Sequence, residues 1–428
     1  MKELNPYIRK IRKFAKRFIA YTIEGEEKVY RLKKTPFCVK KKYTSMYHQE
    51  LEELPVVPQK VVFDNYMGKG YGCNGKYVTQ ELLKQTDDLD IVWIVQNAGT
   101  QKTKFPDRVR LVEYGSKDAM KEYATAGIWV QNYQLVHYLN QGLLKKPEQT
   151  YIQMWHGSFG IKKIENDCGN LTQDRNWMVL AEKNSDYTDY WIANSTFEAD
   201  IYKRAFWNVK DTQICMYGHP RNDIFFHNRW IAARNAVETY ISKKNKKILL
   251  YVPTFRDDAM EWEHQIDYNR LKQSLEQRFS DEWIILVRMH PRMKAYAKKL
   301  IPQEPYCVDV TEYPDIQELL AAADAVVTDY SSAVFDFLLT GKPAFIYAPD
   351  HQRYEKMRGL YYPLEDTPFP IAADNAELAA DIASFNEEDY QKKAAAFLKH
   401  KGSVEDGDAA KRVAGLITDC IKEKRKQG

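Results

Sequence analysis

Hydroxyl, histidine and arginine side chains follow three apolar runs in the second half of this sequence. In the clearest case, the apolar and β-branched run 325–328 leads to Ser331 and Ser332, after which apolar residues recur at helical spacing. The two serines therefore stand where a helix would begin. The unpaired N–H groups and the dipole of a helix N-terminus favour an anion such as phosphate, although an ordinary capped helix would show the same pattern.

Two further apolar runs, at residues 248–252 and 283–287, lead to polar residues in the same way. The polar residues that follow them are Thr254, Arg256, Arg288 and His290. Apolar strands joined through helical segments predict a parallel sheet. Because ligands of such sheets bind beyond the carboxyl ends of the strands, where the three polar loops would converge, the pattern predicts an anion-binding site in this half.

The first half of the chain shows the same alternation. Short apolar runs predict strands at residues 61–63, 91–95, 109–112, 128–131, 151–154, 191–194 and 212–216. The fifth of these runs leads to His156, and the last leads to residues 218–223, which contain Arg221. The glycines of residues 68–72 have the spacing G-x-G-x-G, which matches neither a P-loop nor a dinucleotide fingerprint, so a tight turn is their simplest role.

The composition is that of a large globular protein. The chain has 428 residues, of which 44% are hydrophobic and 29% charged, and is long enough for two or three domains. Its six cysteines are scattered without metal-binding spacing, which predicts reduced thiols in the cytoplasm. No signal peptide is recognisable, and no apolar run approaches the ~20 residues that a transmembrane helix needs.

Basic residues are concentrated near the N-terminus. Residues 1–42 carry 14 Lys or Arg against four Glu, whereas the whole chain has a net charge of +4. Apolar and basic residues fall on opposite helical faces between residues 7 and 19, which predicts an amphipathic helix that binds an anionic membrane surface through residues 1–20. The alternatives are a helix packed on the protein body and a nucleic-acid-binding arm, and we expect no nucleic-acid partner. Residues 24–42 are expected to form a linker or a second peripheral segment.

Several motifs in these loops occur together in one order. They are GKGYG…NGKY (68–77), WHGS (155–158), NSTF (194–197), GHPRND (218–223), PTFRDD (253–258), RMHP (288–291), TDYSSAVFDF (328–337), KPAFIYAPD (342–350) and EDGDAAKRV (405–413). With them the sequence resembles the CDP-glycerol glycerophosphotransferase family of teichoic-acid and capsule synthesis, over about residues 60–420. The resemblance implies transfer of glycerol phosphate, or a related polyol phosphate, from a CDP-activated donor to a membrane-bound acceptor, with release of CMP.

The resemblance also implies an α/β fold of two Rossmann-like domains that face each other across a cleft, the GT-B arrangement. We therefore expect four segments: the basic segment 1–42, an N-terminal acceptor-side domain 43–242, a C-terminal CDP-donor-binding domain 243–402, and a helix with a basic tail 403–428. Three positions depart from the usual family pattern. Ser158 to Lys163 replace Thr-Pro-Leu-Lys after the first histidine, Cys73 and Gly75 replace Asp and Pro, and His219 stands where an aromatic residue is more usual.

The resemblance assigns roles to the polar residues of the strand ends. Transfer to an alcohol needs a base, for which His156 is the family's catalytic histidine, and cations or dipoles for the phosphate oxygens. His290, with Arg288 or Arg292, would hold the diphosphate and the leaving CMP, while Ser331 and Ser332 would donate to phosphate oxygens. The structural alternatives are a buried histidine beside Trp155 and a strand-capping His-Pro turn.

The other donor-side candidates are less sharply assigned. Arg221 and Arg256 are either phosphate clamps or members of interdomain ion pairs, since aspartates lie beside them in the sequence. Thr254 lies in the same loop as Arg256, and Asp336 either orients its helix turn or binds the ribose. No clustered carboxylates suggest a metal site, so we expect neither a metal nor another cofactor.

Two other classes of function remain as alternatives. A nucleotide-sugar glycosyltransferase or epimerase would share the fold and the diphosphate site, and a membrane-peripheral scaffold would share only the fold. CDP-ribitol or another CDP-polyol could replace CDP-glycerol as the donor. For each transferase reading, we expect a cytoplasmic protein that is peripheral on the inner face of the cell membrane and acts on a lipid-linked or polymer acceptor.

Overall fold

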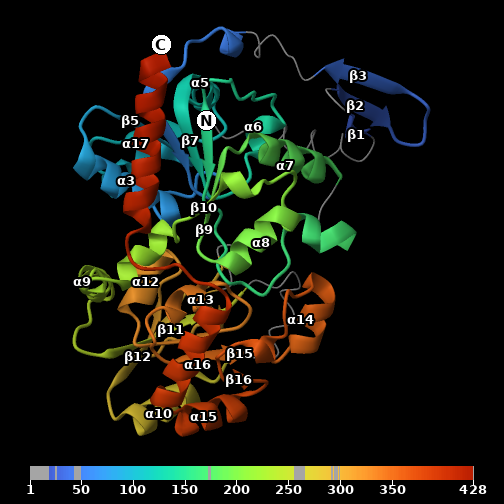
Figure 1. Cartoon of the computed structure of the whole chain (residues 1–428). Helices are drawn as coiled ribbons and strands as arrows, with labels where there is room; N and C mark the ends of the chain where they lie inside the picture. The colour runs from blue at the N-terminus through green and yellow to red at the C-terminus, as the bar shows by residue number, and fades with distance from the viewer. Residues whose placement is uncertain are drawn as a thin grey trace.

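The structure, a computed structural model, describes residues 19–24, 27–42, 50–171, 175–254, 266–290, 293, 297 and 299–427. The strands of this part form three sheets, with seven, six and three strands (Figure 1). The two larger sheets are parallel and are combined with helices, which confirms the mixed α/β class expected from the sequence. None of the helices in the described part is both long and apolar enough to cross a membrane.

The seven-stranded sheet belongs to the first half of the chain. In spatial order its strands are β10 (Ile214–Met216), β9 (Tyr190–Ala193), β8 (Thr150–Gln153), β7 (Ala126–Gln131), β4 (Val57–Asp64), β5 (Asp90–Val95) and β6 (Arg110–Glu113). Side chains alternate between the faces of a strand, so the apolar runs of a parallel sheet are buried on both sides. In β4, Val61 and Phe63 pack into one core, whereas Val62 packs into another.

Helices cover both faces of this sheet. The core around Val61 includes Leu82 of α3 (Cys73–Gln85) and Ile417 of α17 (Ala409–Gln427). The core around Val62 includes residues of α5 (Lys117–Thr125), α6 (Val136–Leu139) and α7 (Arg175–Tyr187). The remaining helices of this half are α4 (Ala98–Gln101), α8 (Thr196–Ala205), and the 3-10 helices η1 (Lys102–Lys104), η2 (Glu165–Leu171), η3 (Asp211–Gln213) and η4 (Pro220–Phe225).

The six-stranded sheet belongs to the second half. Its spatial order is β13 (Cys307–Asp309), β12 (Trp283–Val287), β11 (Lys247–Val252), β14 (Ala325–Thr328), β15 (Ala344–Tyr347) and β16 (Ile371–Ala372). Its helices are α9 (Trp230–Ile241), α10 (Tyr268–Phe279), α12 (Ile316–Ala322), α13 (Ala333–Leu338), α14 (His351–Arg358), η7 (Leu364–Asp366), α15 (Asn375–Ser384) and α16 (Glu387–His400). Because β12, β11 and β14 are neighbours, the three polar loops predicted from the sequence leave the same edge of this sheet.

The described part of residues 24–42, a stretch expected to form a linker or a second peripheral segment, belongs to a small antiparallel sheet, so the linker alternative is the one excluded. The sheet consists of β1 (Ile19–Glu24), β2 (Glu27–Leu32) and β3 (Cys38–Lys42), in which Ile19 pairs with Leu32 and Tyr21 with Tyr30. The linker prediction was wrong because alternating β-branched and aromatic residues formed strands despite the many charges. Ile19, counted in the predicted helix, lies in β1, and the rest of that helix falls outside the described residues.

The last helix returns from the second half of the chain to the first. After α16 the chain pairs with the end of β9, where Val404 N–H donates to the Asn194 carbonyl at 2.9 Å. From there α17 runs along the seven-stranded sheet beside α3 (Figure 1). The core of the first sheet is therefore completed by the C-terminal segment of the chain.

Candidate active site

Polar residues follow four neighbouring strands of the seven-stranded sheet. Asn65 follows β4, Asn132 follows β7, His156 lies just beyond β8, and Asn194 follows β9. The strands are parallel, so these residues gather at one edge of the sheet. Trp155, directly before His156, has a left-handed backbone with φ of 46°, a conformation that residues other than glycine adopt rarely.

His156 is held in one tautomer by the main chain. Its Nδ1 atom lies 2.8 Å from the carbonyl oxygen of Asn132. A carbonyl can only accept a hydrogen bond, so Nδ1 carries the proton and the neutral ring keeps a lone pair on Nε2. Burial lowers the pKa of His156 to about 3, because the charged imidazolium would lose its hydration and face the Arg221 cation. At neutral pH the ring is therefore a proton acceptor through Nε2.

Aromatic rings surround this imidazole, and Asn132 organises them. The ring of Trp155 lies 4.2 Å and that of Tyr66 4.8 Å from the His156 ring centre. The side chain of Asn132 accepts from the Tyr66 N–H at 3.1 Å and donates to Asn65 at 2.7 Å. Asn132 thus orients His156 through its main-chain carbonyl and holds the loop of residues 64–72 through its side-chain amide. The sequence analysis missed Asn132, although its place after a predicted strand was a usable signal.

Two predicted site residues, Arg221 and Asp336, pair with each other. Arg221 Nε lies 2.9 Å from Asp336, and both side chains are buried. The guanidinium also donates to the carbonyl of Gly157, the residue after His156. Of the two roles left open for Arg221, the ion pair is the one observed, and its partner lies in α13 rather than among the aspartates next to it in the sequence. This pair connects the His156 loop to the second half of the chain.

A network of amides and carboxylates surrounds this pair. Asn222 donates to Asp336 at 3.2 Å and to Glu405 at 2.7 Å, and Gln317 donates to Asp336 at 3.2 Å. Burial raises the pKa of Glu405 to about 7. Four separate segments, η4, α12, α13 and the chain before α17, therefore meet through hydrogen bonds that satisfy the buried carboxylates.

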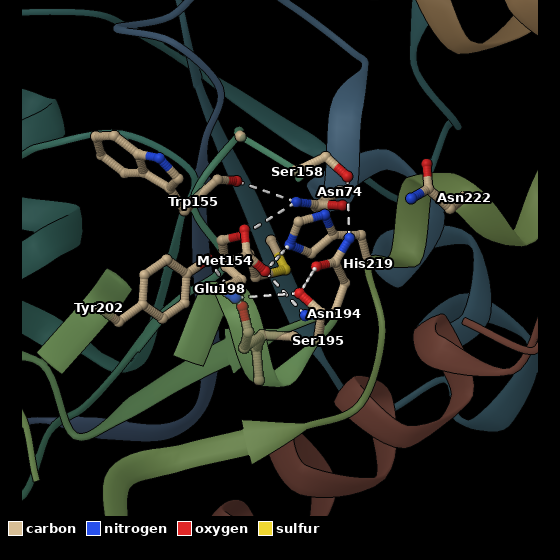
Figure 2. A network of polar contacts seen from close by, with 12 residues as sticks. Asn74, Met154, Trp155, Ser158, Asn194, Ser195, Glu198, Tyr202, His219 and Asn222 are labelled. Carbon is tan, nitrogen blue, oxygen red and sulfur yellow. Dashed lines mark hydrogen bonds and ion pairs between the residues drawn. The ribbon is translucent and has the colours of Figure 1, made fainter. Parts of the chain in front are cut away.

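The unusual His219 lies in the same region, away from water. Its Nε2 atom is 2.9 Å from Glu198, and the Glu198 carboxylate accepts from the Asn194 N–H at 2.8 Å. Figure 2 shows these side chains together with Asn74, whose amide donates to the Trp155 carbonyl at 3.1 Å. Both histidine and glutamate are fully enclosed. This arrangement stabilises the turn before Arg221, and Glu198 was not identified from the sequence.

The serine turn, which contains Ser331 and Ser332, lies at the edge of the six-stranded sheet where the strands have their carboxyl ends. Asp329, just after β14, accepts from both the N–H and the hydroxyl of Thr254, at 3.0 and 2.9 Å. Ser331 accepts from Ala333 N–H at 3.3 Å, and both Ser331 and Ser332 are partly exposed. A Cβ atom added to Gly160 would lie 3.3 Å from Ser332, so the segment after His156 contacts the serine turn directly. The expected N-cap bond from Ser332 is absent among the described contacts, and α13 has only six residues.

The other predicted donor residues are placed as follows. His290 follows β12 and is partly exposed. Arg288 donates to the carbonyl of Tyr313 at 2.6 Å, and burial lowers its pKa from the usual value. Part of its hydrogen-bonding capacity is thus used within the second half of the chain. Arg256 and Arg292 lie outside the described residues. In the described part of the chain, no group of three or more His, Cys, Asp or Glu side chains could hold a metal ion.

Comparison with known proteins shows which family and which relatives this chain resembles. The family described as CDP-glycerol:poly(glycerophosphate) glycerophosphotransferase matches residues 45–419. A teichoic acid poly(glycerol phosphate) polymerase of Staphylococcus epidermidis is 31% identical over 400 residues, which cover 90% of this chain and 54% of that protein. The chain thus spans about half the length of this relative. A teichoic acid glycerol-phosphate transferase of Staphylococcus aureus is 29% identical over 396 residues, which cover 89% of this chain and 98% of that protein.

Solved structures of the wall teichoic acid polymerase TagF share the fold. One has a TM-score of 0.77 and 28% identity, covering 89% of this chain and 93% of that chain. Another, with a TM-score of 0.76, is a TagF histidine variant soaked with CDPG. The likeness to TagF extends over both parallel sheets, because it covers most of this chain.

Proposed function

Because this chain belongs to the CDP-glycerol:poly(glycerophosphate) glycerophosphotransferase family, we propose that it transfers glycerol phosphate from CDP-glycerol to a hydroxyl of a membrane-linked acceptor. The acceptor oxygen forms a bond to the phosphorus that carries glycerol, and the bond from that phosphorus to the bridging oxygen breaks. CMP leaves, and the phosphate remains in the product as a phosphodiester. Teichoic-acid or capsular polymer synthesis is the proposed setting.

The arrangement of His156 is the observation that carries this proposal. Its Nε2 lone pair is available because Nδ1 donates to Asn132, and the loop that holds it contacts the serine turn through Gly160. A base in this position would take the proton of the acceptor hydroxyl as it attacks. A positioned base contributes about 10²–10⁴-fold to the rate.

We assign the donor to the edge of the six-stranded sheet. The strands that precede Thr254, Arg288, His290, Ser331 and Ser332 are neighbours in this sheet, and Arg256 follows Thr254 by two positions in the sequence. In this proposal the serine hydroxyls and His290 hold the diphosphate and stabilise the leaving CMP. Arg221 and Asp336 act by fixing the His156 loop beside the donor. The TagF variant soaked with CDPG supports a CDP-linked donor.

We also propose that the two parallel sheets belong to two Rossmann-like domains of the GT-B arrangement, 43–242 and 243–402, with the catalytic groups between them. The core of the six-stranded sheet is separate from the two cores of the seven-stranded sheet, which supports a division into two domains, and it includes Val237 and Ile241 of α9. The segment 403–428 would then be a C-terminal helix that returns to the first domain. Phosphoryl transfer depends on positioning and on electrostatic stabilisation, which groups from two facing domains would supply together.

The acceptor side requires contact with a membrane. We propose that the protein lies in the cytoplasm on the inner face of the cell membrane and binds anionic lipids through residues 1–20. The sheet β1–β3 supports such contact, because one of its faces carries exposed apolar side chains. We call this the apolar face of β1–β3; its exposed residues are Ile19, Tyr21, Leu32 and Val39, with the half-buried Tyr30 between them and Phe37 at the turn.

CMP release with CDP-glycerol and with CDP-ribitol, measured side by side, tests the proposal. The acceptor is offered both in vesicles and as a short soluble analogue, with His156→Ala as the control. We expect CMP from CDP-glycerol and retention of its labelled β-phosphate in the product. Release of CDP from a nucleotide sugar would instead support a glycosyltransferase, and no turnover of any donor would support a scaffold.

A further inference from the structure

The ammonium group of Lys401 lies among three aromatic rings. Its Nζ atom is 3.5 Å from the ring centre of Tyr362, 4.1 Å from that of Phe197 and 5.3 Å from that of Phe397. Lys401 is largely buried, with 8% of the residue exposed. A cation over aromatic faces is stabilised by the ring electrons, and more strongly when water is excluded.

These aromatic residues come from different parts of the fold. Phe197 is in α8, beyond the edge of the first sheet, whereas Phe397 is in α16 and Tyr362 follows α14 in the second half. The carbonyl of Lys401 accepts from the Phe197 N–H at 3.1 Å and from the Thr196 hydroxyl at 3.2 Å. Lys401 therefore sits at the point where the chain returns from the second half to the first.

Tyr362 connects this cage to the segment after His156. Its hydroxyl donates to the carbonyl of Phe159. The neighbouring Tyr361 N–H donates to the Ile161 carbonyl at 2.6 Å, and Lys163 N–H donates to the Gly359 carbonyl at 3.2 Å. Residues 359–362 thus hold residues 159–163, and Gly160 in that segment contacts Ser332.

We propose that Lys401 is a positioning residue for the transfer reaction. Its charge fixes the ring of Tyr362, which through Phe159 holds the His156 loop against the serine turn. The proposal rests on the function proposed above. Lys401 does not touch the reacting atoms; it sets the distance between the group that accepts the proton and the groups that hold the donor.

The charge, and not only the volume, is the proposed determinant. Burial lowers the pKa of Lys401 to about 8, so the group is still mostly protonated at pH 7. The Asp366 carboxylate favours the charged form but is not within bonding distance. A methionine would fill the same space without the desolvation cost of a charge, so a role confined to stability would not require lysine here.

Lys401→Met, Lys401→Arg and Tyr362→Phe test the proposal in the full-length chain. We expect Lys401→Met to lower kcat about tenfold with an unchanged affinity for CDP-glycerol, since orientation rather than donor binding is lost. Lys401→Arg keeps a cation that stacks on aromatic rings and should recover kcat to within about threefold of wild type. Lys399→Met, at an exposed position in the last turn of α16 just before Lys401, is the matched control and should have no effect.

Hydrogen exchange of residues 155–163 provides a readout independent of activity. We expect faster exchange in Lys401→Met and in Tyr362→Phe, which removes only the hydroxyl bond to Phe159, and wild-type exchange in Lys399→Met. The melting temperature of Lys401→Met should not fall, because a buried charge is removed. If Lys401→Met does not fold, hydrogen exchange and kcat of Tyr362→Phe test whether this contact holds the His156 loop.

The proposal would be overturned if Lys401→Met and Tyr362→Phe both kept the hydrogen exchange and the kcat of the wild type. It would also be overturned if Lys401→Arg and Lys401→Met lost kcat equally. Failure of the wild-type chain to release CMP would overturn the proposed function alone. The exchange data would still decide whether Lys401 holds the loop.

Discussion

The nitrogen of His156 that accepts a proton is chosen by a main-chain carbonyl. Many catalytic histidines are oriented by a carboxylate, which also stabilises the imidazolium that forms. Asn132 offers only a neutral oxygen, so it fixes the tautomer with less stabilisation of the charged ring. The phosphate groups of a bound donor would supply the missing negative charge. In the proposed complex, these phosphates would raise the pKa of His156 and make it a stronger base.

Replacing His156 with alanine should abolish transfer while leaving the fold and donor binding nearly intact. The base acts mainly in the transition state, so kcat should fall about 10²–10⁴-fold. CMP release and calorimetric binding of CDP-glycerol measure the two effects separately. A variant with activity within about tenfold of wild type would remove His156 from the role of base.

The pH dependence of the free enzyme follows from the low pKa of His156. A base is active when unprotonated, and this group is unprotonated above about pH 3. We therefore expect kcat/KM to show no acid limb from His156 between pH 5 and 8, unlike a histidine with the ordinary pKa of about 6.5. Titration of the His156 ring by NMR is the direct measurement. A His156 ring that titrates near pH 6.5 in the folded free chain would contradict this low pKa.

Among the structural elements, η4 and α13 depend on the Arg221–Asp336 pair. Asp336→Asn leaves a buried guanidinium without its counter-charge and should lower the free energy of unfolding by about 3–5 kcal/mol. Replacing both residues together, as Arg221→Met with Asp336→Leu, should cost less than Asp336→Asn alone. Denaturant unfolding measures both.

The exposed pair Glu388–Lys392 in α16 is a suitable control for that experiment, since its removal by Glu388→Gln should cost less than about 1 kcal/mol. Equal costs for the buried and exposed pairs would mean that Asp336 contributes little to joining the two halves of the chain.

Glu405, in the segment before α17, should make stability dependent on pH. Its pKa is raised to about 7 in the folded chain, above the unfolded value near 4.5, so the folded state binds more protons between these values. Stability should therefore fall as pH rises from about 4.5 to about 7, by up to roughly 3 kcal/mol from this group. Glu405→Gln should show a smaller decrease over the same range in denaturant unfolding. Parallel curves for the two proteins would exclude this contribution.

The positions of strands and helices could be predicted from the sequence better than the contacts between distant side chains. Buried parallel strands such as β14 are continuous apolar runs, which made their positions readable. The short strands of β1–β3 alternate with lysines and were mistaken for a linker. Arg221 could not be paired from sequence, because Asp336 lies 115 residues away and its closeness depends on how the two halves meet. Asn132 was missed because an amide suggests no chemistry until a histidine is placed beside it.

At the scale of the whole molecule, the N-terminal region should govern contact with membranes. Deletion of residues 1–20 should release the protein from anionic vesicles and lower activity on a lipid-linked acceptor, but not on a short soluble one. Because that deletion also removes Ile19 of β1, Phe37→Ser with Val39→Ser tests the apolar face of β1–β3 in a chain of full length; these side chains are 63% and 49% exposed. Each basic residue near the surface is worth about 1 kcal/mol and is screened by salt.

Vesicle sedimentation at low and high salt measures this binding, with Trp230→Ser as the control for an exposed aromatic side chain elsewhere. Equal sedimentation of the full and the shortened chain would place the membrane contact outside residues 1–20.

Because α17 packs on the first sheet, part of the core of that sheet is synthesised long after its strands. The strands of that sheet are complete at Met216, whereas the helix that covers one of its faces ends at Gln427. At about 5–20 residues per second, a ribosome needs roughly 10–40 s to deliver the missing helix. During that interval Val61, Phe63 and their neighbours lack part of their cover. A growing chain of this protein therefore exposes apolar surface of an incompletely covered sheet, to which chaperones of nascent chains can bind until α17 has been synthesised.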